Sequence, residues 1–77
     1  MDGKKIQINL KSVEDILEFV SITEKCDFEI YINAQDHNIV NGKSLLGLCT
    51  VIGYGNLNVL YNGESKSLSA MLDKFHI

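Results

Sequence analysis

The chain has 77 residues, of which 45% are hydrophobic and 22% charged, a composition that indicates one small globular domain over residues 1–77. Its formal net charge of −3 argues against sequence-independent binding to nucleic acid, which needs clustered Lys and Arg, because the seven basic residues are scattered. No apolar run reaches the roughly 18 residues that span a membrane, and the N-terminal residues lack the order of a signal peptide. We therefore expect a cytoplasmic protein that contacts no membrane.

The first half of the chain predicts a strand, a helix and a hairpin. Apolar and polar residues alternate over residues 4–10, which is the period of a strand with one buried face. A helix is expected to begin near Ser12, which resembles an N-cap because Asp15 follows three residues later. The apolar residues at helical spacing are Val13, Ile16, Leu17 and Val20. Alternation over residues 26–33 and the short apolar run at 39–42, joined by a polar connection, predict two antiparallel strands.

The second half predicts a short helix, a strand and a closing helix. Ser44 follows an Asn-Gly turn and is suited to cap a helix over residues 45–51, which the Gly53–Gly55 loop ends. Residues 56–63 alternate as a strand and end in a second Asn-Gly turn. Residues 64–77 form an amphipathic helix whose apolar stripe is Leu68, Met71, Leu72 and Phe75.

The resulting order, βαββαβα, predicts an α+β open-faced sandwich with a four-stranded, mostly antiparallel sheet and three helices on one face. The other face is expected to be solvated, although it could instead bind a partner. Its residues are Lys5, Gln7, Asn9, Glu29, Tyr31, Asn33, Asn56 and Asn58.

The cysteines and histidines form no recognisable motif. Cys26 and Cys49 are too few for a disulfide scaffold, so we expect two reduced thiols. Together with His37 and His76 they lack the short spacing of structural zinc sites, so no metal is expected. Both histidines are expected to be exposed and idle, since their suitability for proton transfer alone implies no site.

The stretch "VNGKSLLGLCTVIGYG", together with the βαββαβα order, resembles the histidine-containing phosphocarrier (HPr) family of the sugar phosphotransferase system. The distinctive part is "GKSLLGL", in which a Lys-Ser pair opens a short helix and is followed by two apolar residues and a Gly. The resemblance in element order covers nearly the whole chain, but only about a dozen residues are distinctive. It implies the open-faced sandwich already expected from the pattern.

The resemblance also implies a difference at the first helix, where the family carries a His, an Arg two residues on, and then a Pro. Ser12, Glu14 and Asp15 stand at these positions, to within about one residue. A serine ester is not a high-energy phosphoryl donor like phosphohistidine, and Glu14 would repel a phosphate that an Arg would bind. We therefore expect no catalytic residue at this site and no competent phosphocarrier.

By the resemblance, Ser44 matches a serine that is phosphorylated by an ATP-dependent kinase in many members of the family. A phosphate there would add about −1.5 to −2 charges at a helix N-terminus, without unfolding the chain. The alternative is that Ser44 only caps the helix, a contribution of about 1 kcal/mol. Lys43 could contact an acidic partner or neutralise the phosphate.

Nearly every residue of the second helix is apolar, so some of its side chains must remain exposed. The resemblance implies that Leu48 and Val51 face the sheet. It also implies that Leu45, Leu46 and Cys49 form an apolar patch that binds protein partners. The alternative is an unusually apolar helix in a small protein.

The sequence thus favours an HPr-like regulatory or protein-interaction module without enzymatic activity or cofactor, with HPr kinase or a transcriptional regulator as its expected partners. One alternative is a phosphoryl carrier that uses a non-standard acceptor, and another is a purely structural or interaction domain. The oligomeric state is left open.

Overall fold

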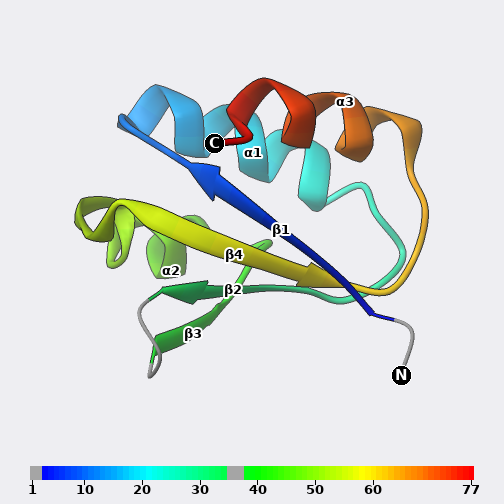
Figure 1. Cartoon of the computed structure of the whole chain (residues 1–77), viewed down its shortest axis with the longest axis horizontal. Coiled ribbons are helices and arrows are strands. Elements are labelled where there is room, and N and C mark those ends of the chain that lie inside the picture. Colours follow the sequence, from blue (N-terminus) through cyan, green and yellow to red (C-terminus); the bar gives the residue numbers. More distant parts are fainter. Residues whose placement is uncertain (1–2, 35–37) are drawn as a thin grey trace.

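A computed structural model describes residues 3–34 and 38–77 and contains the predicted order of strands and helices (Figure 1). The elements are β1 (Lys4–Asn9), α1 (Val13–Thr23), β2 (Ile30–Ala34), β3 (Asn38–Asn41), α2 (Leu45–Cys49), the 3₁₀ helix η1 (Ile52–Tyr54), β4 (Asn56–Tyr61) and α3 (Lys66–Phe75).

The strands form one sheet in the order β1-β4-β2-β3, and each neighbouring pair among the described residues is antiparallel. The register places Ile6 opposite Val59, Val59 opposite Ile32, and Ile32 opposite Val40. Because side chains alternate between the two faces of a strand, this row points to one face across the whole sheet. The predicted α+β open-faced sandwich is confirmed.

The helices cover that apolar face and form the core with it. In Figure 1, α1 and α3 run side by side, and α1 packs against both α2 and α3. On the opposite face, the predicted polar residues are exposed or half-buried, as expected for a solvated surface. The core residues are Ile8, Leu10, Ile16, Phe19, Ile30, Ile32, Ala34, Leu48, Val51, Leu57, Val59, Tyr61, Leu68, Met71, Leu72 and Phe75.

Helix α1 buries only part of its predicted apolar stripe: Ile16 is fully buried and Val20 packs against the core. Val13 and Leu17 are 57% and 51% exposed, whereas Phe19 and Thr23 are fully buried. Phe19 offers a large apolar surface to the core, and the Thr23 hydroxyl donates a buried hydrogen bond of 2.8 Å to the Gly42 carbonyl. The helix is therefore rotated so that Val13 and Leu17 face solvent.

Several boundaries differ from the sequence prediction. Strand β2 begins at Ile30 rather than near Cys26. Helix α2 ends at Cys49 rather than Val51, and part of the predicted Gly53–Gly55 loop belongs to η1. Gly55 follows with a φ of 83°, a left-handed conformation that a glycine adopts without steric cost and that leads the chain into β4.

None of the helices in residues 3–34 and 38–77 combines the length and the apolar content that a membrane crossing requires.

Candidate functional site

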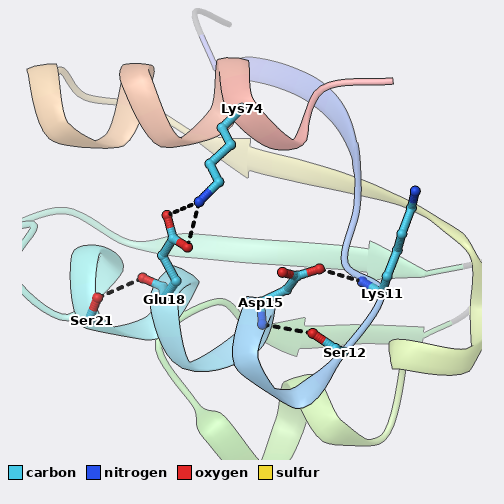
Figure 2. Close-up of polar contacts among 6 residues, drawn as sticks. All are labelled: Lys11, Ser12, Asp15, Glu18, Ser21 and Lys74. Carbon is cyan, nitrogen blue, oxygen red and sulfur yellow. Dashed lines mark hydrogen bonds and ion pairs between the residues drawn. The ribbon is translucent and has the colours of Figure 1, made fainter.

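The N-terminus of α1, where the resemblance places a phosphoryl-accepting histidine in the family, is closed by its own side chains (Figure 2). The Ser12 hydroxyl accepts a hydrogen bond of 3.2 Å from the Asp15 backbone N–H. In return, the Asp15 carboxylate accepts a bond of 2.9 Å from the backbone N–H of Lys11. These two bonds occupy the amides of Asp15 and Lys11, which an anion could otherwise use.

Carboxylates dominate the rest of α1. The helix carries Glu14, Asp15 and Glu18 between its first and last residues and no Lys or Arg. Glu18 forms an ion pair with Lys74 of α3, with Oε1 and Oε2 at 2.8 and 2.9 Å from the ammonium nitrogen (Figure 2). Glu14 is exposed, and no ion pair or hydrogen bond of its carboxylate occurs among the described residues. The chemistry of this helix end is therefore that of a capped helix with surplus negative charge.

Ser44 is the N-cap of α2, as predicted. Its backbone is extended, with φ −104° and ψ 114°, and its hydroxyl accepts a hydrogen bond of 3.1 Å from the Gly47 N–H. The side chain is half-buried, so part of it is open to solvent. Gly47 lies beside β3, because a Cβ at this position would be 3.4 Å from the Cβ of Val40.

The capping geometry of Ser44 is shared by the serines that begin α1 and α3. The Ser12 and Ser65 hydroxyls each accept a hydrogen bond of 3.2 Å from the N–H three residues later. Capping alone therefore does not distinguish Ser44 from these two residues. Its neighbours do, because Ser44 is followed directly by two exposed leucines, whereas Lys66 and Ser67 follow Ser65.

Lys43 makes a structural contact. Its ammonium donates a hydrogen bond of 2.7 Å to the backbone carbonyl of Cys26, in the connection between α1 and β2. The backbone N–H of Lys43 donates to the Asn41 side chain at 2.8 Å. The sequence suggested that Lys43 contacts a partner or a phosphate. In the structure, the ammonium links the start of α2 to the end of α1, and the partner or phosphate contact stays a prediction.

The exposed and buried sides of α2 are those that the resemblance implied. Leu48 and Val51 are at most 1% exposed and lie in the core. On the other side, Leu45 is 39% exposed, Leu46 is 81% exposed, and Cys49 is also exposed. An 81% exposed leucine keeps most of its apolar surface in water, where burial against a partner would be favourable.

Val13 and Leu17, predicted to lie on the apolar stripe of α1, are further exposed apolar residues. Their spacing, i and i+4, places them on one side of the helix. Helical periodicity could not separate them from the core, because α1 has apolar residues over most of its circumference. Together with Leu45 and Leu46 they are called the α1–α2 apolar surface below.

The histidines and cysteines bring no additional chemistry to the described residues. His76 is exposed and lines a surface cavity of about 390 Å³ with Lys11, Asp15 and Lys74, among other residues. His37 lies outside the described residues. Both cysteines are free thiols, and within residues 3–34 and 38–77 no three His, Cys, Asp or Glu side chains are placed to hold a metal ion.

Comparison with known proteins identifies the fold. No protein-family profile and no curated protein sequence matches the chain. The crystal structure of a phosphocarrier protein HPr from Bacillus anthracis str. Ames superposes on it with a TM-score of 0.73 and 25% sequence identity. The match covers 96% of this chain and 95% of the HPr chain. The chain is therefore an HPr-like protein, with the four-stranded sandwich of the phosphocarrier fold over nearly its whole length.

Proposed function

We propose that this HPr-like protein is a regulatory or protein-interaction module that does not carry phosphoryl groups. The observation that supports this proposal is the capped N-terminus of α1, where the Ser12 hydroxyl accepts from the Asp15 N–H and the Asp15 carboxylate accepts from the Lys11 N–H. A phosphocarrier needs an imidazole nitrogen that accepts a phosphoryl group and passes it on. A phosphate ester of serine is not a high-energy phosphoryl donor of this kind.

The charge at this position supports the same proposal. A phosphoryl group carries negative charge and is stabilised by guanidinium or ammonium groups and by free amides. Here Glu14 stands where the family carries Arg, and Asp15 places a second carboxylate on the Lys11 amide, directly before Ser12. A phosphoryl group at Ser12 would face both carboxylates.

We further propose that Ser44 is a regulatory phosphorylation site, beside a docking surface that includes Leu45, Leu46 and Cys49. A phosphate on Ser44 would change the charge at the edge of this surface and thereby the choice of protein partner. Lys43 directly precedes Ser44 and is a further proposed partner contact, and its ammonium bonds to the Cys26 carbonyl. The expected partners are a kinase of the HPr kinase type and a transcriptional regulator.

Incubation with an HPr kinase and ATP, followed by mass spectrometry, tests the regulatory proposal. We expect one phosphate on the wild type, none on Ser44→Ala, and an unchanged level on Ser65→Ala. Ser65 is a matched control because it caps α3 with the same hydrogen-bond geometry. An unmodified Ser44, in an assay that phosphorylates an ordinary HPr in parallel, would remove the main support for regulation.

Transfer of ³²P from phosphoenolpyruvate through the first enzyme of the phosphotransferase system tests the loss of carrier activity. We expect no label on the wild-type protein. Label would overturn the proposal in favour of a carrier with a non-standard acceptor, and the variants His76→Ala and His37→Ala would then identify it. A purely structural domain predicts instead that Ser44→Asp leaves every partner interaction unchanged.

A further inference from the structure

The exposed apolar residues of α1 lie on the side of the helix that faces α2. Successive residues of an α-helix are rotated by about 100°, so Val13 and Leu17 lie about 120° around the helix from Glu18. The ion pair with Lys74 places Glu18 on the side of α3. Because α1 packs against both α2 and α3, the opposite flank of α1, which carries Val13 and Leu17, is the flank next to α2.

The exposed residues of α2 lie toward α1 and solvent by the same reasoning. Leu48 points into the core, and Gly47 lies against Val40 of β3. Leu45 lies about 60° from Leu48 around the helix, in the direction away from Gly47, and Leu46 is farther around, toward solvent. Leu45 is thus on the flank opposite β3, where α1 packs. The four residues of the α1–α2 apolar surface therefore lie on facing, solvent-exposed flanks of the two helices. Leu45 and Leu46 lie toward the C-terminal end of α1, where the Thr23 and Lys43 bonds join α1 to the start of α2.

The charge that borders this surface is negative at the N-terminal end of α1. Glu14 lies about 60° around the helix from Leu17, on the solvent side, and no described side chain neutralises it. The nearby basic residues are directed elsewhere. Lys11 and Lys74 line the cavity that also contains His76. The Lys43 ammonium is bonded to the Cys26 carbonyl, beyond the opposite end of α1.

We propose that the α1–α2 apolar surface binds a protein segment that presents an apolar stripe flanked by Lys or Arg. The inference rests on the proposed docking function and specifies the chemistry of the partner. Apolar area supplies the attraction at Val13, Leu17, Leu45 and Leu46, and a basic group opposite Glu14 supplies charge complementarity, which steers association and excludes acidic competitors. The family Arg at the Glu14 position would select the opposite charge.

Titration of three synthetic peptides into ¹⁵N-labelled protein tests this inference. Each peptide is an amphipathic 14-mer with one leucine stripe, and the residues that flank the stripe are Lys in the first, Gln in the second and Glu in the third. We expect the Lys-flanked peptide to bind at least about tenfold more tightly than the Glu-flanked peptide, in low-salt buffer. The amide shifts should concentrate in residues 13–24 and 44–51.

The variant Glu14→Lys should lower the affinity for the Lys-flanked peptide by about fivefold or more and raise the affinity for the Glu-flanked peptide. The affinities of Glu14→Gln should lie between those of Glu14→Lys and the wild type. Glu64→Lys is the matched control, because it changes the net charge equally at a side chain that is 91% exposed and lies next to α3. Equal binding of the three peptides at this surface, or an equal effect of Glu64→Lys, would overturn the charge preference and leave the docking function standing. Binding of none of the peptides at α1 and α2 would overturn both.

Discussion

Replacement of Ser44 separates its capping role from its proposed regulatory role. In Ser44→Ala the Gly47 N–H loses the acceptor that now lies 3.1 Å away. The loss of a serine N-cap costs about 1 kcal/mol in the free energy of unfolding. For a domain of this size, that cost corresponds to a fall of roughly 4–8 °C in Tm. The full cost is expected here because α2 has only five residues and anchors the buried Leu48.

Ser44→Asp should behave differently, because an aspartate is as good an N-cap as serine and its charge favours a helix N-terminus. We expect its free energy of unfolding to stay within about 0.3 kcal/mol of the wild-type value. A loss of partner binding in Ser44→Asp would then report the added charge, as a phosphate would add it, rather than unfolding.

Urea denaturation followed by far-UV circular dichroism at pH 7 measures both variants. Ser65→Ala and Ser65→Asp on α3 provide matched controls, because the Ser65 hydroxyl accepts from the Leu68 N–H at 3.2 Å. A Ser44→Ala protein as stable as the wild type would refute the capping argument. A Ser44→Asp protein as unstable as Ser44→Ala would show that the carboxylate does not reach the Gly47 amide.

Three further predictions test the supporting structure by the same denaturation assay. Lys43→Met removes the bond to the Cys26 carbonyl and should lower the free energy of unfolding by about 1–2 kcal/mol. Unchanged stability would contradict the role of Lys43 in linking α2 to the end of α1. Gly63→Ala should lower the free energy of unfolding by about 1–3 kcal/mol, because the added Cβ would overlap the Phe28 ring. In the double variant with Phe28→Leu, the smaller side chain at position 28 should restore much of this loss. Burial, with a smaller effect from a nearby carboxylate, raises the pKa of Tyr61 above its ordinary value of 10.0. The unfolded chain therefore loses this proton at a lower pH than the folded chain, so stability should fall as the pH rises above about 10, and Tyr61→Phe should flatten that fall between pH 9 and 11.

The order of elements could be predicted from the sequence because each element carries its own local signal. The closing helix α3 is the clearest case, since Leu68, Met71, Leu72 and Phe75 form its single apolar stripe and all four are buried. The predicted caps at Ser12 and Ser44 were equally local, because a serine hydroxyl bonds an amide only three residues away. Such features depend on neighbours in the sequence, so they can be recognised without knowledge of the fold.

The orientation of α1 could not be predicted in the same way. Its apolar residues occupy most of the helix circumference, so periodicity alone did not decide between Leu17 and Phe19 as the core residue. The contacts that decide it come from far along the chain, such as the hydrogen bond from Thr23 to the Gly42 carbonyl and the ion pair from Glu18 to Lys74. The exposed positions of Val13 and Leu17 follow from these contacts.

The sequence by itself determined the secondary structure, the fold class and the absence of a histidine at the N-terminus of α1, because these depend on residue type and spacing. Only the tertiary structure decided which apolar side chains remain in water and where the charges lie. In the folded chain the Lys43 ammonium donates to the Cys26 carbonyl, and Leu17 and Leu46 lie on the exposed sides of two adjacent helices. The physical reason is that burial and charge pairing depend on contacts between segments that are distant in sequence.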